Sequence, residues 1–224
     1  MLQIPRHESK LPGWVLSRFS RILDYCGNVI DTEVYGKLSF YPEAAIPRGL
    51  SLNWIRINPD IYTFLMDPQS DAPAAYINAM PIDDRAYAEI RSGERDDNTV
   101  TAEDVVPYVM SNTVKVYLMS IAVAEKHRRW GEGFLQTSYV QLLTGFIDKL
   151  IWYAKRHHVR VTHILASAWT PEGRRICQSF AMTQVGMHRF GDAIFELDLE
   201  ALRRGPATKV PSAFRSLLKV YSQM

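Results

Sequence analysis

The chain has 224 residues, of which 47% are hydrophobic and 22% charged, and its formal net charge is +2. This length fits one large domain, or one domain with an appendage, and the composition is that of a soluble globular protein. No run of five or more basic residues occurs, so nothing indicates a nucleic-acid partner. Two cysteines, Cys26 and Cys177, are too few for a disulfide framework, which favours a reducing compartment.

The sequence also gives no sign of export or of membrane insertion. The first ten residues contain no apolar signal core. The longest stretch of low charge, residues 134–147, carries too many polar side chains to span a bilayer. We therefore expect a cytoplasmic protein.

Residues 1–50 are expected to form a helical segment of the main domain. Apolar residues within 13–25 recur at helical spacing, with Arg18 and Arg21 on the other side. Such a helix either packs on the domain or lies on a membrane surface, and we favour packing. Residues 26–50 are predicted to be loop and short helix, because prolines interrupt any regular element there.

Residues 51–200 are predicted to form the main domain, in which strands and helices alternate. Strands at 61–66 and 74–82 flank a turn rich in Asp, Pro and Ser, so they are predicted to pair as a hairpin. A short helix follows, with Asp83 as its N-cap and Gly93 at its end.

The remaining elements follow from apolar periodicity. They are, in chain order, a strand at 115–123, a long helix at 134–157, a strand at 161–166, a helix at 171–180 capped by Thr170, and strands at 183–188 and 193–199. The tail, residues 201–224, offers an apolar helical face made of Phe214, Leu217, Leu218 and Tyr221. This face should dock on the domain itself or on a second subunit in a homodimer, and we favour the domain itself.

The junction between the strand 115–123 and the long helix carries the most specific motif of the chain, Arg128-x-x-Gly131-x-Gly133. A turn of this kind aims several backbone N–H groups, and the positive end of a helix dipole, at one point that suits a phosphate. The glycines let a ligand approach the backbone, and the adjacent arginines supply donors for phosphate oxygens. An ordinary turn with solvated arginines would have the same residues.

This motif, placed between a strand and a helix, resembles the acyl-CoA pyrophosphate loop of the GNAT N-acetyltransferases. The order of elements over about residues 50–200 is similar to the GNAT fold, an α/β fold with a mixed central sheet and helices on both faces. The resemblance implies acyl-CoA as the donor, most simply acetyl-CoA, and an N-acyltransferase in which an amine attacks the thioester directly. The acceptor, a small molecule or a protein amine, is not specified.

The resemblance also implies a cofactor-binding site. The pantetheine arm would pair with the strand edge around Ile121, Ala122 and Val123, where this strand splays from the strand at 161–167, and a free N–H near Val123 would face the thioester carbonyl. The pyrophosphate would lie on the loop after Arg128, with the Glu132 side chain pointing away. The residues of that loop are Arg129, Trp130, Gly131, Glu132, Gly133 and Phe134.

Three residues are candidates for catalysis. Many GNAT members carry a tyrosine four residues before a Gly-Phe pair, and here Cys177 takes that place while Ala181-Met182 replaces the pair. Cys177 is therefore either a proton donor to the leaving thiolate or a small buried apolar residue. Ser167, after the strand at 161–166, is a candidate for contact with the cofactor, and Glu125 is either a base or a solvated side chain.

Other functions remain open or are set aside. His157, His158 and His163 straddle a helix end and a strand, so no metal site is expected. Because Cys177 stands where many GNAT members have a tyrosine, a GNAT-like protein that binds acyl-CoA without turnover is an alternative. A second alternative is a protein-interaction module, in which the amphipathic ends, residues 13–25 and 210–221, dock a partner.

Overall fold

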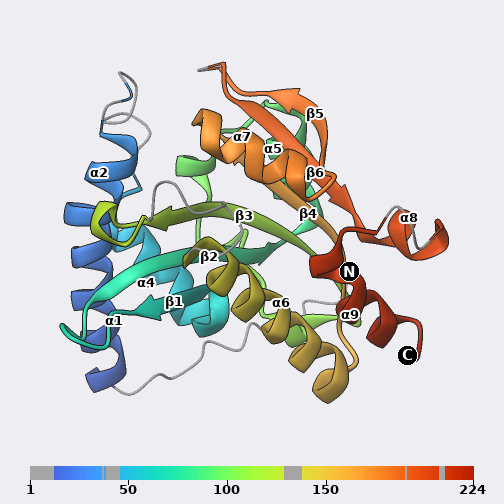
Figure 1. Cartoon of the computed structure of the whole chain (residues 1–224), viewed down its shortest axis with the longest axis horizontal. Helices are drawn as coiled ribbons and strands as arrows, with labels where there is room; N and C mark the ends of the chain where they lie inside the picture. Colours follow the sequence, from blue (N-terminus) through green and yellow to red (C-terminus); the bar gives the residue numbers. More distant parts are fainter. Residues whose placement is uncertain (1–12, 37, 39–45, 129–137, 190, 207–209) are drawn as a thin grey trace.

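The computed structural model describes residues 13–36, 38, 46–128, 138–189, 191–206 and 210–224. They contain a six-stranded sheet in the order β1-β2-β3-β4-β6-β5 (Figure 1). The strands are β1 (Tyr62–Met66), β2 (Pro73–Ile82), β3 (Thr113–Val123), β4 (Arg160–Ala168), β5 (Thr183–Met187) and β6 (Ala193–Asp198). β3 and β4 run parallel and every other neighbouring pair is antiparallel, so the sheet is mixed as predicted.

The helices lie before, between and after the strands. They are α1 (Gly13–Tyr25), α2 (Thr32–Tyr35), α4 (Arg48–Ile57), α5 (Asp84–Ser92), α6 (Ser138–His157), α7 (Pro171–Ser179), α8 (Leu199–Arg204) and α9 (Ser212–Tyr221). A π-helical turn, η1 (Cys26–Asp31), joins α1 to α2, and short 3-10 turns lie at Pro59–Ile61, Asp97–Thr99, Tyr108–Met110 and Glu125–His127. None of the described helices is long and apolar enough to cross a membrane.

Helices cover both faces of the sheet, because successive side chains of a strand point to opposite sides. In β3, Val114 and Val116 pack into one core with residues of α6 and α9. Tyr117 and Met119 of the same strand belong to the other core, with residues of α1, α4 and α5. Figure 1 shows α6 in front of the sheet, with α9 beside it.

The predicted helix caps are confirmed. The Asp83 carboxylate accepts the N–H of Ala86 at 2.8 Å at the start of α5, and Gly93 ends that helix with φ of 81°. In α7 the Thr170 hydroxyl accepts the N–H of Gly173 at 3.0 Å. These local signals fix where both helices begin, which in turn places α7 directly after the end of β4.

Two regions differ from the sequence-based expectation. The segment after residue 25, predicted as loop and short helix, contains the short helix α2, but η1 stands where a loop was expected because Cys26 and Ile30 are buried against Tyr76 of the sheet. The last strand ends at Asp198, whose carboxylate accepts the N–H of Ala201 at 2.8 Å and so begins α8. In the first case tertiary packing outweighs the local proline signal, and in the second a helix cap ends the apolar run that we used.

The C-terminal tail docks on the domain itself. α9 packs against α6, and its four apolar residues, Phe214, Leu217, Leu218 and Tyr221, are buried in the core under the sheet. The Tyr221 hydroxyl also accepts the backbone N–H of Val161 at 2.9 Å. Of the two docking modes that we considered, the structure therefore has the intrachain one.

Candidate functional site

β3 and β4 separate at the end of their parallel pairing. The pairing runs from Thr113 and Arg160 to Leu118 and Ala166. Beyond that point β3 continues only against β2, as far as Val123, and β4 continues only against β6. The two strands therefore splay apart where the resemblance implied, and they leave a split in the middle of the sheet.

A β-bulge lies at the start of the split. Asn78 of β2 pairs with Ser120 of β3, whereas Ala79 pairs with Leu118, so Met119 is an extra residue on β3. A bulge bends its strand and increases the local twist. Its place, one residue after the last contact with β4, gives a physical reason for the divergence of the two strands.

Beyond the bulge, the free edge of β3 presents backbone groups to the split. The N–H of Ala124 donates to the carbonyl of Ala74 on β2 at 2.9 Å, and the register continues without interruption back to Ser120. Because hydrogen-bonding direction alternates along a strand, the N–H and C=O groups of Ile121 and Val123 face away from β2. The Ile121 carbonyl accepts the Tyr35 hydroxyl at 3.3 Å, and the Val123 carbonyl accepts Arg128 Nε at 2.7 Å.

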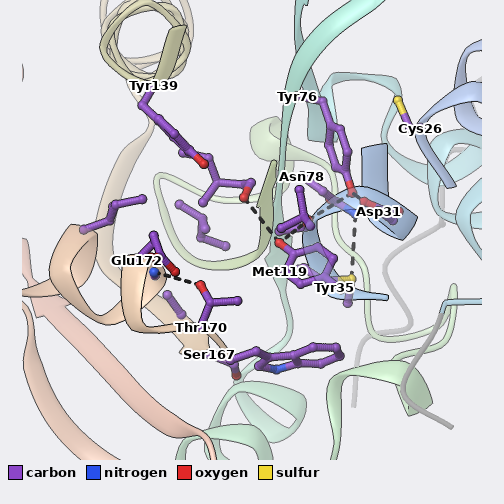
Figure 2. Close-up of a pocket in the computed structure, with 18 of the residues that line it drawn as sticks. Cys26, Asp31, Tyr35, Tyr76, Asn78, Met119, Tyr139, Ser167, Thr170 and Glu172 are labelled. Atoms are coloured by element: carbon purple, nitrogen blue, oxygen red, sulfur yellow. Dashed lines mark hydrogen bonds between the residues drawn. The ribbon is translucent and has the colours of Figure 1, made fainter. Parts of the chain in front are cut away.

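A cavity of ≈ 670 Å³ occupies the split. Figure 2 shows that Tyr139, Thr170 and Glu172, from α6 and the start of α7, lie on one side of it. Residues from η1, α2 and β2 lie on the opposite side, among them Asp31 and Asn78. The cavity thus passes between two strands and has chemically different ends.

The end near α6 and α7 is basic. The basic residues of the described lining are His127, Arg128 and Arg175, and Glu172 is the acid at this end. Arg128 uses Nε to hold Val123, while its Nη2 is buried and has no hydrogen-bond partner among the described residues. A buried guanidinium nitrogen without a partner favours an incoming anion or carbonyl oxygen.

The predicted cofactor residues are only partly covered by the structure. Ile121 and Arg128 line the cavity, while Ala122 and Val123 are buried in β3. Arg129, Trp130, Gly131, Glu132, Gly133 and Phe134 lie outside the described residues. Their role in binding a pyrophosphate therefore remains a prediction.

Cys177 lines the cavity from α7, but it is also part of a small apolar cluster with Ala166 and Phe195. Burial raises the pKa of its thiol to about 12. An ordinary thiol has a pKa of about 8.5. Cys177 is therefore a weaker acid than the CoA thiol that would form if it protonated the departing thiolate. The geometry allows contact with a ligand, and the chemistry favours the apolar role.

Ser167 lines the cavity at the centre of a hydrogen-bonded network. Its hydroxyl lies 2.8 Å from the Tyr117 hydroxyl and 2.8 Å from Nε2 of His188. Tyr117 donates to the buried Asp97 carboxylate at 3.2 Å, and Nδ1 of His188 lies 3.7 Å from Asp96. Ser167 was predicted as a contact residue, whereas the network behind it was not predicted.

The groups around Ser167 have shifted proton affinities. Burial, together with the neighbouring Asp192, raises the pKa of Asp97 to about 7, although the Tyr117 hydrogen bond opposes the shift. Burial lowers the pKa of His188, so its ring is neutral at neutral pH. The network therefore contains a carboxyl group with a pKa near neutrality and an unprotonated imidazole ring.

Glu125 is not brought to this site. It lies in the 3-10 turn after β3 with an exposed side chain, and it is not among the described residues that line the cavity. Its backbone N–H donates to the Glu33 carboxylate at 2.7 Å. Of the two roles considered for Glu125, the structure favours the solvated side chain.

The end near η1 and β2 holds a second network that sequence reasoning missed. Tyr76 donates to the Asp31 carboxylate and accepts from Ser120 at 3.0 Å, and Tyr35 lies 3.4 Å from Ser120. Burial raises the pKa of Asp31 to about 6, although the Tyr76 hydrogen bond opposes the shift. One signal was available: Asn78 is an amide within an otherwise apolar strand.

No family model matches the sequence, and no curated protein is detectably similar to it. Solved structures do resemble the fold. The C-terminal condensation domain of Ebony with bound beta-alanyl-dopamine is similar over 80% of this chain and 95% of its own, at 10% identity and a TM-score of 0.45. A histone acetyltransferase HPA2-related protein from Corynebacterium glutamicum is similar over 83% and 92%, at 10% identity and a TM-score of 0.43.

A GNAT-family acetyltransferase structure from Desulfovibrio desulfuricans is similar over 84% of this chain and 95% of its own, at 14% identity and a TM-score of 0.40. Identities and TM-scores of this size assign no activity to the chain. The strand order, the single parallel pair and the split beyond Leu118 are features of the chain itself. They give it the mixed sheet, flanked by helices on both faces, that its sequence predicts.

Proposed function

We propose that the chain is an acyl-CoA-dependent N-acyltransferase, with acetyl-CoA as the simplest donor, in which an acceptor amine attacks the thioester inside the split. The free edge of β3 is the observation that carries this proposal. Its Ile121 and Val123 N–H groups face the split, and the cavity there is basic at one end and acidic at the other. An extended pantetheine arm can add to such an edge as a further strand.

The basic end suits the phosphates of the donor. Arg128 is held in place by its bond to Val123 and keeps a buried Nη2 for an acceptor oxygen. The loop that contains Gly131 and Gly133 follows directly, and its glycines would let a pyrophosphate approach the backbone. The thioester would then lie in the split, next to the free edge of β3.

The reaction forms a C–N bond and breaks a C–S bond. The neutral amine attacks the thioester carbonyl carbon, and a backbone N–H of β3 stabilises the negative charge that develops on the oxygen. Collapse of this intermediate expels the CoA thiolate, and the nitrogen loses a proton. The protein must therefore supply a base, because an amine arrives as an ammonium ion at neutral pH.

The network around Ser167 would serve as that base. The Ser167 hydroxyl faces the cavity and can pass a proton to Nε2 of His188, which is 2.8 Å away. Burial lowers the pKa of His188, so the ring is unprotonated and can accept a proton, as a weaker base than an ordinary imidazole. Asp97, reached through Tyr117, offers a second acceptor. Cys177 has no role in this scheme beyond packing and contact.

Calorimetry with CoA tests the donor site. Gly131→Val should abolish CoA binding in a folded protein, because a side chain at this position would occupy the phosphate site. Arg128→Ala should weaken CoA binding about tenfold or more, whereas Arg204→Ala, on exposed α8, should not change it. Unchanged affinity in folded Gly131→Val would contradict the assignment. Binding without thiol release from acetyl-CoA would favour the second candidate, a non-catalytic acyl-CoA-binding protein.

A further inference from the structure

Carboxylates line the end of the cavity between η1, α2 and β2, here called the acidic end. Asp31 and Glu33 line it, together with Asp24 of α1. The basic residues of the described lining, His127, Arg128 and Arg175, belong to the other end, near α6 and α7. Several carboxylates around one partly enclosed space attract a cation and repel an anion.

An unsatisfied amide independently points to a ligand in this space. Asn78 is only 3% exposed and lines the cavity, and its Oδ1 has no hydrogen-bond partner among the described residues. Its Nδ2 is already used, by the Tyr62 hydroxyl at 3.1 Å and by Met119 Sδ at 3.7 Å. A buried oxygen in this position requires an N–H or O–H donor, and the folded chain supplies none among the described residues.

Hydrogen bonds hold the Asp31 side chain in a fixed position at the acidic end. Tyr76 donates to its carboxylate, and Ser120 on β3 donates to Tyr76 at 3.0 Å. Because Ser120 is one residue before Ile121, this network links the carboxylate to the edge where the thioester would lie. The group is mostly ionised at neutral pH, since its pKa is raised only to about 6.

Aromatic rings form much of the remaining wall. Tyr62 lies 6.1 Å from Tyr76, centroid to centroid, and Tyr35 packs edge-on against Trp169 at 5.8 Å. Figure 2 shows Tyr35 and Tyr76 on the same side of the cavity as Asp31 and Asn78. Aromatic faces attract cations and also pack against an apolar body.

We infer that the acidic end binds a small amine as its cation, with the nitrogen between Asp31 and Asn78, and that it rejects amines that carry a carboxylate. The ammonium group would donate to Asn78 Oδ1 and balance the Asp31 charge, and an uncharged body would lie against the tyrosines. A free amino acid would bring its own carboxylate next to Asp31. The role of this amine as the acyl acceptor rests on the proposed function, but its binding does not.

Matched ligands test the inference without acyl-CoA. Calorimetry would compare 2-phenylethylamine with phenylalanine, and pentylamine with norleucine, because each pair differs only by a carboxylate. We expect at least one amine to bind about tenfold or more tightly than its amino acid. Equal affinity within both pairs, or no measurable binding of either amine at 10 mM (about the weakest Kd that calorimetry detects), would overturn the inference.

Variants locate the site. Asp31→Asn and Asn78→Leu should each weaken amine binding about tenfold while leaving CoA binding unchanged. Asp71→Asn, the same chemical change in an exposed turn, should have no effect. Amine affinity that is unchanged in both folded cavity variants would overturn the assignment. If amine binding depends on Asp31 but CoA does not bind, the amine site is supported and the acyl-transfer proposal is contradicted.

Discussion

The role of Cys177 depends on its burial rather than on its position in the motif. The resemblance made the thiol a candidate acid, and the structure places it against the cavity. Burial then raises its pKa to about 12, well above the value of about 8.5 for an ordinary thiol. Proton transfer from Cys177 to the departing thiolate would therefore be uphill.

Cys177→Ala should accordingly keep kcat within about threefold of the parent, with a small loss of stability from the lost sulfur contacts. Steady-state release of free thiol from acetyl-CoA measures the rate, and thermal unfolding measures the stability. A fall in kcat of about 10²-fold with unchanged KM for acyl-CoA would show instead that Cys177 acts as the general acid.

Ser167 and His188 should act as one unit. Ser167→Ala and His188→Gln each remove a member of the proton path, so each should lower kcat by about 10²-fold or more with little change in the KM for acyl-CoA. The double variant should be no slower than the slower single variant. Ser70→Ala, in the exposed turn before β2, serves as the control. If the loss of kcat in the double variant equals the product of the two single losses, Ser167 and His188 act independently and the shared proton path is contradicted.

Asp31 should make stability depend on pH. Its pKa is raised from 3.8 to about 6, so between these values the folded protein holds a proton that the unfolded chain has released. The free energy of unfolding contributed by this group therefore falls as pH rises through that window. Denaturant unfolding should show Asp31→Asn gaining stability relative to the parent from about pH 4 to about pH 6. A difference between the variant and the parent that stays constant over this pH range would refute the shift.

At the scale of elements, the bulge in β3 shows where sequence reasoning stops. The strand itself was predictable, because 115–123 is an apolar run bounded by polar segments. The extra residue, Met119, was not, since an apolar side chain fits both a regular strand and a bulge. The caps at Asp83 and Thr170 were predictable because the side chain that makes the bond is adjacent in sequence.

The tail helix α9 belongs to the core rather than to an appendage. Leu217 is fully buried in the cluster shared with α6, so Leu217→Ala should lower the free energy of unfolding by about 2–5 kcal/mol. Lys219→Ala, on the exposed side of the same helix, should change it by less than about 0.5 kcal/mol. Equal effects of the two variants in denaturant unfolding would contradict the docking of α9.

At the scale of the whole molecule, the split in the sheet and its Arg128 end were predictable, and the acidic end was not. Arg128 and the strand edge are consecutive in sequence, so one motif indicates both. Asp31, Tyr76 and Ser120 come from three distant segments, and their hydrogen bonds exist only after η1 folds over the sheet. No spacing in the sequence marks such a network.

The measurement that tests the central claim most directly is product analysis by mass spectrometry after incubation of the protein with acetyl-CoA and a panel of small amines. The account predicts an N-acetylated amine and free CoA in equal amounts, with both greatly reduced for Ser167→Ala. Intact acetyl-CoA and unmodified amines, from a protein that binds both, would contradict acyl transfer and leave a binding protein.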